Sequence, residues 1–600
     1  MEIIQGILEG IGKFFGNIVE GATAVFTATD SVELIYTAIV RWVFIFLAVF
    51  ILSKAILSLL KSKNPSEVWA YLHIGDYENI PITHWENVIG RAKSCDIQVD
   101  DLSVSRNHGT LTRDNDGVWS YMDLGSKNGA VINGVQARPY IPVEVRAGDD
   151  IVMGAAVCTL FPVSIEEHNN NVLLRTEDTK LLSPWPSLLA ITLFQILTVI
   201  QLKFALGDKF YFSSLLAFAG LCAVMWVYVI FLRTMKRKGF EIETIAFFLS
   251  TLSLAVTATC LPDQVFKQFI AVAIGVVLFF FMCTFLRNLE RTIEIKKYIY
   301  IAAALLLLVN LVLGRLGGAI NGSYNWIQFA GMSIQPSEIV KLAFIWVGAA
   351  SLDELFRKKN SLVFTLFSGF CFACLALMGD FGTAIIFFVT FLVISFLRSG
   401  DFTKLILILG VAFVGGLMVL RFKAYVAARF AVWGHVWQYA DAGGYQQTRT
   451  MTAAASGGFV GLGAGEGWLR FIPASQTDLV FGVLTEEWGL IIAIMAVLAI
   501  ITLSIFAFRS IWAGRSTYYT IAACSAMSIF LFQTVLNVFG SVDLLPLTGV
   551  TFPFVSSGGT AMIASWGLLA FLKAADTRQN ASIAVSLSDR GLTSEGSDEI

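Results

Sequence analysis

Apolar runs long enough to cross a bilayer recur along most of this chain and leave room for few other architectures. One run covers 34–60, and from 186 onward such runs follow one another almost without pause. A helix needs about 20 apolar residues to span a bilayer, and only 14% of the chain is charged. The sequence therefore predicts a polytopic α-helical membrane protein of about thirteen spans. The last three are expected at 481–508, 518–541 and 553–572.

One long stretch breaks this pattern. Between 67 and 163 polar and apolar residues alternate as in strands, and turn residues are frequent. This predicts a small all-β domain inserted after the first span. The predicted order is an N-terminal segment (1–33), a transmembrane anchor (34–60), the all-β domain (67–163), a linker (164–185), two additional helices (186–232), a membrane core (242–573) with a large loop (421–480), and a disordered tail (574–600).

The placement of Lys and Arg orients these parts, because positive loops favour the cytoplasmic side of a membrane. Basic clusters at 236–238, 287–297 and 357–359 fall on one side of the predicted spans. The all-β domain and the tail share that side, which we interpret as cytoplasmic. The loop at 421–480 and the acidic segment 1–33 are then extracytoplasmic. The loop is basic against the usual bias, so we interpret it as an anion site.

Charge and cysteine usage argue against two classes of function. The net charge of −2 gives no sign of nucleic-acid binding. Cys371 and Cys374 lie one helical turn apart in an apolar run with no His nearby, so we interpret them as core residues rather than metal ligands. Cys95 and Cys158 fall in the cytoplasmic domain and are expected to be free thiols. We predict no protein metal site.

The all-β segment carries Ile-Gly-Arg at 89–91, Ser-Val-Ser-Arg-Asn-His at 103–108 and Asp-Leu-Gly-Ser-Lys-Asn-Gly at 123–129. Their order and spacing resemble a forkhead-associated (FHA) domain, a β-sandwich that binds phosphothreonine through loops at one end. An Arg can fork onto a phosphate, and His108 is expected to organise the loops. A sandwich that has lost binding is the alternative. The resemblance implies five ligand-binding residues: Arg91, Ser105, Arg106, Lys127 and Asn128.

The membrane core holds an unusual polar stretch, with Asn-Trp-Ile-Gln-Phe at 325–329 and Gln-Pro-Ser-Glu-Ile-Val-Lys at 335–341. Glu338 and Lys341 are three residues apart and so share one face of a helix. Ionisable groups inside a membrane are costly and usually face a partner or a wet cavity. Trp326 either packs on a substrate or joins the aromatic belt at the membrane surface.

Further motifs follow in order: Gly-Asp-Phe-Gly-Thr-Ala at 379–384, Asp-Ala-Gly-Gly-Tyr-Gln at 441–446, Glu-Glu-Trp-Gly at 486–489 and Pro-Phe-Val-Ser-Ser-Gly-Gly-Thr at 553–560. With the preceding stretch they closely resemble the SEDS family, the FtsW, RodA and SpoVE proteins. The resemblance implies a ten-helix membrane core and an inverting glycosyltransferase that polymerises lipid II into peptidoglycan strands, in cell division or elongation.

Such a reaction needs a base near the attacking sugar hydroxyl and cations near the departing pyrophosphate. By resemblance Asp441 is the catalytic base, and a turn-forming role is the alternative. Asp478 and Glu486 either contact substrate or stabilise a helix N-terminus. No cofactor is firmly implied, and a divalent cation, Mg or Mn, is left open. The predicted supporting or substrate-binding residues are Glu338, Lys341, Asp380, Trp326, Arg449, Arg470, Asp478, Glu486 and Ser556.

Glu338, Lys341 and Asp380 could fix the cavity as a charge network, and a purely structural ion pair is the alternative. The leading hypothesis for the whole chain is a polymerase regulated by phosphothreonine binding. A lipid II transporter and an inactive scaffold that recruits phosphoproteins are the alternatives.

The resemblance also implies a location and partners. The location is the bacterial plasma membrane, crossed several times. The partners are lipid II (the undecaprenyl-pyrophosphate-linked disaccharide peptide), a class B penicillin-binding protein transpeptidase, and a phosphothreonine protein from a Ser/Thr kinase pathway. Thr577 and Thr593 in the chain's own tail are candidate phosphothreonines, and nucleic acid is not an expected partner.

Overall fold

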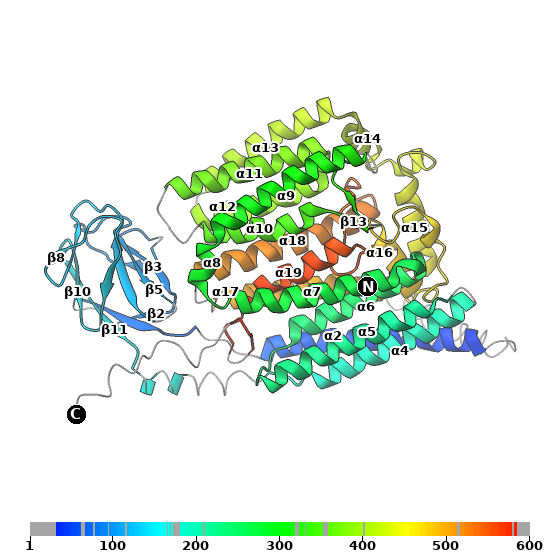
Figure 1. Ribbon diagram of the computed structural model, residues 1–600, viewed down its shortest axis with the longest axis horizontal. Helices are drawn as coiled ribbons and strands as arrows, with labels where there is room; N and C mark the ends of the chain where they lie inside the picture. The colour runs from blue at the N-terminus through cyan, green and yellow to red at the C-terminus, as the bar shows by residue number, and fades with distance from the viewer. Residues whose placement is uncertain are drawn as a thin grey trace, which may run out of the picture.

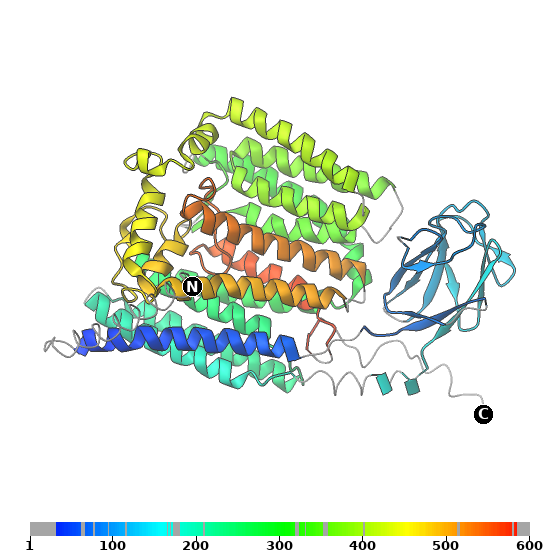
Figure 2. The same cartoon turned by 180° about the vertical axis from the view of Figure 1, so that it is seen from behind.

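A helical bundle and a smaller β-sandwich make up the molecule, and the sandwich lies at one end of the bundle (Figures 1 and 2). A computed structural model describes residues 32–61, 66–75, 79–93, 95–114, 117–164, 166–167, 170–171, 181–207, 210–318, 323–329, 332–351, 358–399, 402–512, 516–578 and 581–584. The predicted N-terminal segment before residue 32 and most of the predicted linker lie outside these ranges.

Long apolar helices form the bundle, as the hydropathy pattern predicts. Within the described ranges nine helices are long and apolar enough to cross a membrane, and three shorter apolar helices accompany them. The predicted multi-pass architecture is confirmed, while the count of about thirteen spans stays a prediction. The helices are α2 (Val32–Lys61), α4 (Trp185–Leu206), α5 (Phe212–Thr234), α6 (Glu241–Cys260), α7 (Val265–Phe285), α9 (Lys296–Gly317), α10 (Pro336–Ala350), α11 (Lys358–Met378), α12 (Phe381–Ser399), α13 (Phe402–Phe422), α17 (Leu490–Trp512), α18 (Thr517–Ser541) and α19 (Gly559–Ala574).

Short elements gather at the end of the bundle that lies away from the sandwich (Figures 1 and 2). Half of them belong to the loop at 421–480, which folds into short helices rather than extended chain. These elements are the hairpin β12 (Ile327–Phe329) and β13 (Met332–Ile334), α14 (Ala424–Val432), η3 (Val436–Tyr439), α15 (Tyr445–Gly457), η4 (Leu469–Phe471), α16 (Val480–Val483) and the π-helix η5 (Leu484–Trp488). At other places in the chain lie η2 (Pro262–Gln264) and α8 (Leu289–Glu294).

Two predicted span starts are wrong. The span expected at 481–508 begins at Leu490, because Gly489 has φ +87° and ends the preceding π-helix. A Cβ at Gly489 would collide with the Phe459 carbonyl oxygen, so only glycine allows this close approach. The span expected at 553–572 begins at Gly559, because the residues before it form a loop.

The additional N-terminal helices pack on the membrane core. α6 is buried along its whole apolar length, and α2 and α4 both contact it. Phe44 of α2 lies 4.6 Å from Phe194 of α4 and 4.7 Å from Trp488, measured between ring centroids. Gln195 donates to the Thr251 hydroxyl at 3.0 Å. The additional helices therefore cover a face of the core that would otherwise meet lipid.

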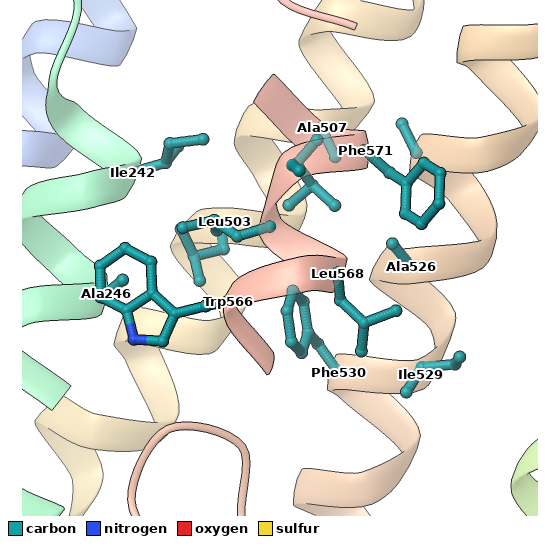
Figure 3. Packing of buried hydrophobic residues seen from close by; sticks show 14 of the residues in the cluster. Ile242, Ala246, Leu503, Ala507, Ala526, Ile529, Phe530, Trp566, Leu568 and Phe571 are labelled. Atoms are coloured by element: carbon teal, nitrogen blue, oxygen red, sulfur yellow. The ribbon is translucent and has the colours of Figure 1, made fainter. Parts of the chain in front are cut away.

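The core of the bundle is centred on α19, whose neighbours are α7, α10 and α18. The fully buried Trp566 packs against Phe247, Phe279 and Phe554, with ring centroids 5.0, 5.8 and 5.8 Å away. Aromatic pairs at such distances add about 0.5–1.5 kcal/mol beyond burial. Figure 3 shows other buried residues of this core, among them Ala246 of α6 and Leu503 of α17, around Trp566 of α19.

The β-sandwich consists of a six-stranded sheet, in the order β2-β1-β11-β10-β7-β8, and a five-stranded sheet, in the order β4-β3-β5-β6-β9. Trp85, Tyr121 and Ile151 are fully buried between them. The alternating sequence thus folds as the predicted all-β domain. The strands are β1 (Ala70–Ile74), β2 (Ile80–Ile82), β3 (Glu86–Gly90), β4 (Ile97–Gln98), β5 (Gly109–Arg113), β6 (Trp119–Asp123), β7 (Ala130–Ile132), β8 (Val135–Gln136), β9 (Val143–Val145), β10 (Asp150–Met153) and β11 (Ala156–Pro162).

The first part of the predicted disordered tail is packed, so that prediction is wrong for residues 574–578 and 581–584. Arg578 is buried and pairs with Glu241 at 3.1 Å and with Asp576 at 2.9 Å. The segment is packed because basic side chains in it and just before it face two acids at the start of α6. Arg578 pairs with Glu241, and Lys573 pairs with Glu243 at 2.9 Å. Opposite charges from the two chain segments neutralise each other there.

Of the two candidate phosphothreonines in the tail, the structure describes only Thr577. Thr577 is only 3% exposed, so in this fold it is not available to a kinase or a binding domain. Thr593 lies outside the described residues.

Candidate functional site

Three loops at one end of the sandwich bring the predicted phosphothreonine-binding residues together. Arg91 directly follows β3, and its backbone N–H donates to the Ser105 carbonyl at 3.0 Å. The Ser105 hydroxyl accepts from the Lys127 N–H at 3.0 Å, and the Asn128 side chain donates to the Ser103 carbonyl at 2.7 Å. These hydrogen bonds fix the three loops against one another.

His108 joins two of the same loops through hydrogen bonds of its buried ring. It is fully buried, and its Nδ1 accepts from the Ser105 N–H at 3.1 Å. The proton therefore sits on Nε2, which donates to the Gly129 carbonyl at 3.0 Å. The ring organises the loops, as expected. Gly90 adds to this close fit, because a Cβ there would collide with the Arg106 carbonyl oxygen.

α14 and α15 lie at the end of the bundle away from the sandwich (Figure 1). Asp441 lies in the turn between η3 and α15. Its side chain is 97% exposed, and one carboxylate oxygen lies 3.7 Å from Arg449 Nη2. The Arg449 guanidinium also stacks over the Tyr445 ring, 5.0 Å from the centroid. A carboxylate and a positioned cation thus stand side by side on an accessible surface.

Asp380 directly precedes α12 and accepts hydrogen bonds from that helix and from the polar stretch before α10. Its carboxylate accepts from Asn325 at 2.6 Å, from Gln335 at 3.2 Å and from the Thr383 N–H at 3.1 Å. The last bond caps the helix. The sequence prediction missed Asn325 and Gln335 as its partners, although both lie in the polar stretch it singled out.

Glu338 and Lys341 pair with each other one turn apart on α10, at 2.7 Å. Their side chains are only 7% and 1% exposed. Of the two arrangements considered, the structure shows a buried ion pair of Glu338 with Lys341, while Asp380 takes the separate partners described above. Trp326, just before β12, is half-buried.

Glu486 and Arg470 form hydrogen bonds with the backbone of the large loop near its C-terminal end. The Glu486 carboxylate accepts from the N–H groups of Trp468 and Leu469 at 3.0 and 2.9 Å, at the start of η4. Arg470 donates to the Gly465 carbonyl at 2.6 Å. Of the two roles considered for Glu486, these contacts match stabilisation of a helix N-terminus.

Ser556 and Asn537 tie the end of the large loop to the segment before α19. The Ser556 hydroxyl donates to the Thr477 carbonyl at 2.7 Å. Asn537, in α18, donates to the carbonyls of Val550 and Asp478 at 2.8 and 3.2 Å. The prediction missed Asn537, although an amide inside an apolar run is a recognisable signal. Burial raises the pKa of the neighbouring Asp478 carboxyl, and a Thr477 hydrogen bond opposes that rise.

Within the described ranges, no group of three or more His, Cys, Asp or Glu side chains could hold a metal ion. The exposed residues of the prediction lie on two surfaces. The phosphothreonine-binding residues gather on the sandwich, and Asp441 with Arg449 lies at the far end of the bundle.

Comparisons with known proteins match both parts of the chain. The family model described as "Cell cycle protein", which covers FtsW, RodA and SpoVE, matches residues 241–581, and the FHA domain model matches 87–154. A "Probable peptidoglycan glycosyltransferase FtsW" from Borreliella burgdorferi is 30% identical over 265 residues, covering 42% of this chain and 71% of that protein. A "Peptidoglycan glycosyltransferase RodA" from Mycobacterium leprae is 30% identical over 327 residues, covering 51% and 68%.

Among solved structures, a chain from "Structural coordination of polymerization and crosslinking by a peptidoglycan synthase complex" is similar with a TM-score of 0.47 and 24% identity. The match covers 56% of this chain and 96% of that one. Because the first family model spans 241–581 of a 600-residue chain, this chain belongs to the FtsW/RodA/SpoVE family and carries an FHA domain.

Proposed function

We propose that this protein is a peptidoglycan glycosyltransferase that polymerises lipid II, and that its FHA domain brings it under control of a phosphothreonine protein. The observation that carries the proposal is the family match over 241–581, whose relatives are named peptidoglycan glycosyltransferases. The exposed Asp441 beside Arg449 supports it, because polymerisation needs a base and a cation within reach of a large substrate.

In the proposed reaction Asp441 accepts the proton of the acceptor sugar hydroxyl. The hydroxyl oxygen then forms a bond to the anomeric carbon of the donor, and the bond from that carbon to the lipid pyrophosphate breaks with inversion. Arg449 is placed to balance the negative charge that develops on the pyrophosphate.

The proposed sidedness places the FHA domain in the cytoplasm and Asp441 outside the cell. Its support is that the sandwich and the α14–α16 region lie at opposite ends of the bundle (Figure 2). Family membership supports a class B penicillin-binding protein as the partner that crosslinks the new strand. A transporter would need no exposed base, so Asp441 favours the polymerase over the lipid II transporter.

The test is polymerisation of purified lipid II by the full chain together with a candidate transpeptidase partner. We expect Asp441→Asn to lower the rate at least about a hundredfold, the usual size of a general-base contribution. The matched control is Asp543→Asn, a carboxylate on the same end of the bundle that accepts from the Gly434 N–H at 3.0 Å. Full activity of the Asp441 variant would show that another group is the base, and an inactive native complex would favour the scaffold.

A further inference from the structure

A side chain of the β-sandwich caps a helix of the membrane bundle. Glu86, the first residue of β3, accepts from the Ser516 hydroxyl at 2.7 Å and from the Thr517 N–H at 2.9 Å. Ser516 is the N-cap residue of α18 and is fully buried, and Glu86 is only 7% exposed. A carboxylate at a helix N-terminus is favoured by the helix dipole as well as by these hydrogen bonds.

The same strand leads away from this contact to the phosphothreonine-binding loops. Arg91 follows β3 directly, so at a rise of 3.3 Å per residue it lies about 16 Å from Glu86. Glu86 pairs with Thr112 across the sheet, which fixes the strand within the sandwich. Docking on α18 and binding of phosphothreonine therefore occupy opposite ends of one strand.

The binding residues remain open while the domain is docked. Arg106, Lys127 and Asn128 are exposed, and the hydrogen bonds described for Ser105 and Asn128 stay within the sandwich. A ligand shifts an equilibrium only when it interacts differently with the two states. A phosphothreonine segment at these loops meets the same surface whether Glu86 is docked or not.

We propose that Glu86 fixes the FHA domain on the end of α18 with its binding loops turned outward, so that the domain presents a phosphothreonine segment of a second protein beside the bundle without switching the enzyme on or off. This inference rests on the proposed function. Thr577 of this chain is buried and so is not the occupant, and the inference commits to a segment of a second protein. The phosphothreonine protein then acts on the enzyme by being held beside the bundle. No conformational change passes along α18 to the membrane core.

The first test measures docking in the full-length protein by hydrogen exchange. We expect Glu86→Ala to speed exchange of the Thr517 amide by about tenfold, the size expected when a helix loses its cap. Glu86→Gln should have a smaller effect, because its amide oxygen still accepts one hydrogen bond. The matched control is Glu144→Ala, an exposed residue of β9 in the same sandwich. Unchanged exchange in Glu86→Ala would overturn the docking contact.

The second test measures binding and activity of the same variants. The probe is an immobilised phosphothreonine peptide library with random flanking residues, and the unphosphorylated library is its control. Glu86→Ala should retain peptide affinity within about twofold, while Arg91→Ala should lose at least about tenfold. The library should not change the rate of lipid II polymerisation by the native protein.

Two results would overturn the inference of passive placement. One is a polymerisation rate that responds to the phosphorylated library, with a response that disappears in Glu86→Ala. The other is peptide affinity that depends on Glu86, because coupling between two sites is reciprocal. An inactive native protein would instead count against the proposed function, and the exchange and binding measurements would still decide the docking.

Discussion

At the scale of single residues, the polar groups of this protein differ mainly in whether their partners are near or far in sequence. Glu338 and Lys341 are one helical turn apart, and their pair could be predicted from that spacing. Asp380 could be predicted as a site residue, but its partners Asn325 and Gln335 lie 55 and 45 positions away. Only the packing of β12, β13 and α12 brings those amides to the carboxylate.

The buried pair on α10 gives a prediction for stability. Lys341→Met should lower the free energy of unfolding by about 3–5 kcal/mol, because Glu338 is left as a buried charge without its partner. The double variant Lys341→Met with Glu338→Gln should recover most of that loss. Unfolding in mixed detergent micelles measures both. As a control, Arg146→Met breaks an exposed pair with Glu144 and should change little. Equal loss in the single and double variants would contradict this explanation.

At the scale of elements, apolar composition predicted the helices well and their ends poorly. The apolar run at 481–484 was counted into the span, yet it forms most of α16 and the first residue of a π-helix that ends at Gly489. The reason is a backbone contact with the segment at Phe459, which composition does not encode. The start of α19 was misplaced in the same way, because Ser556 is held by the Thr477 carbonyl of a different loop.

Gly489 offers a direct test of that break. Gly489→Ala should destabilise the protein by about 1–3 kcal/mol, because φ is +87° and the added Cβ meets the Phe459 carbonyl. The midpoint of thermal unfolding in detergent measures the effect. The matched control is Gly410→Ala in α13, where a Cβ has open space, and helix propensity should make that change neutral or slightly stabilising. Equal midpoints for the two variants would rule out the close approach.

At the scale of the whole molecule, contacts between distant segments join the parts that sequence analysis treated as separate. Arg578 and Glu241 are 337 positions apart, and Glu86 and Ser516 are 430 positions apart. The first contact fixes the chain after α19 against α6. The second fixes the sandwich against α18.

Truncation tests the first of these contacts. A chain that ends after Ala584 should fold with native stability, because the contacts of Arg578 are retained. A chain that ends after Ala574 should lose about 3–5 kcal/mol, since Glu241 then keeps a buried charge without its guanidinium partner. Yield and unfolding midpoint of the purified proteins measure the difference. If both truncations behave alike, the buried segment does not stabilise the bundle.

The sequence by itself determined the membrane-spanning class, the inserted β-sandwich and the motifs of both parts. These depend on local periodicity and on residue types at fixed spacing, which a chain displays before it folds. Tertiary structure alone decided that α2 and α4 cover α6, that Arg578 is buried and that Glu86 caps α18. An apolar face or a charge needs a partner, but its own sequence does not say which distant segment supplies one.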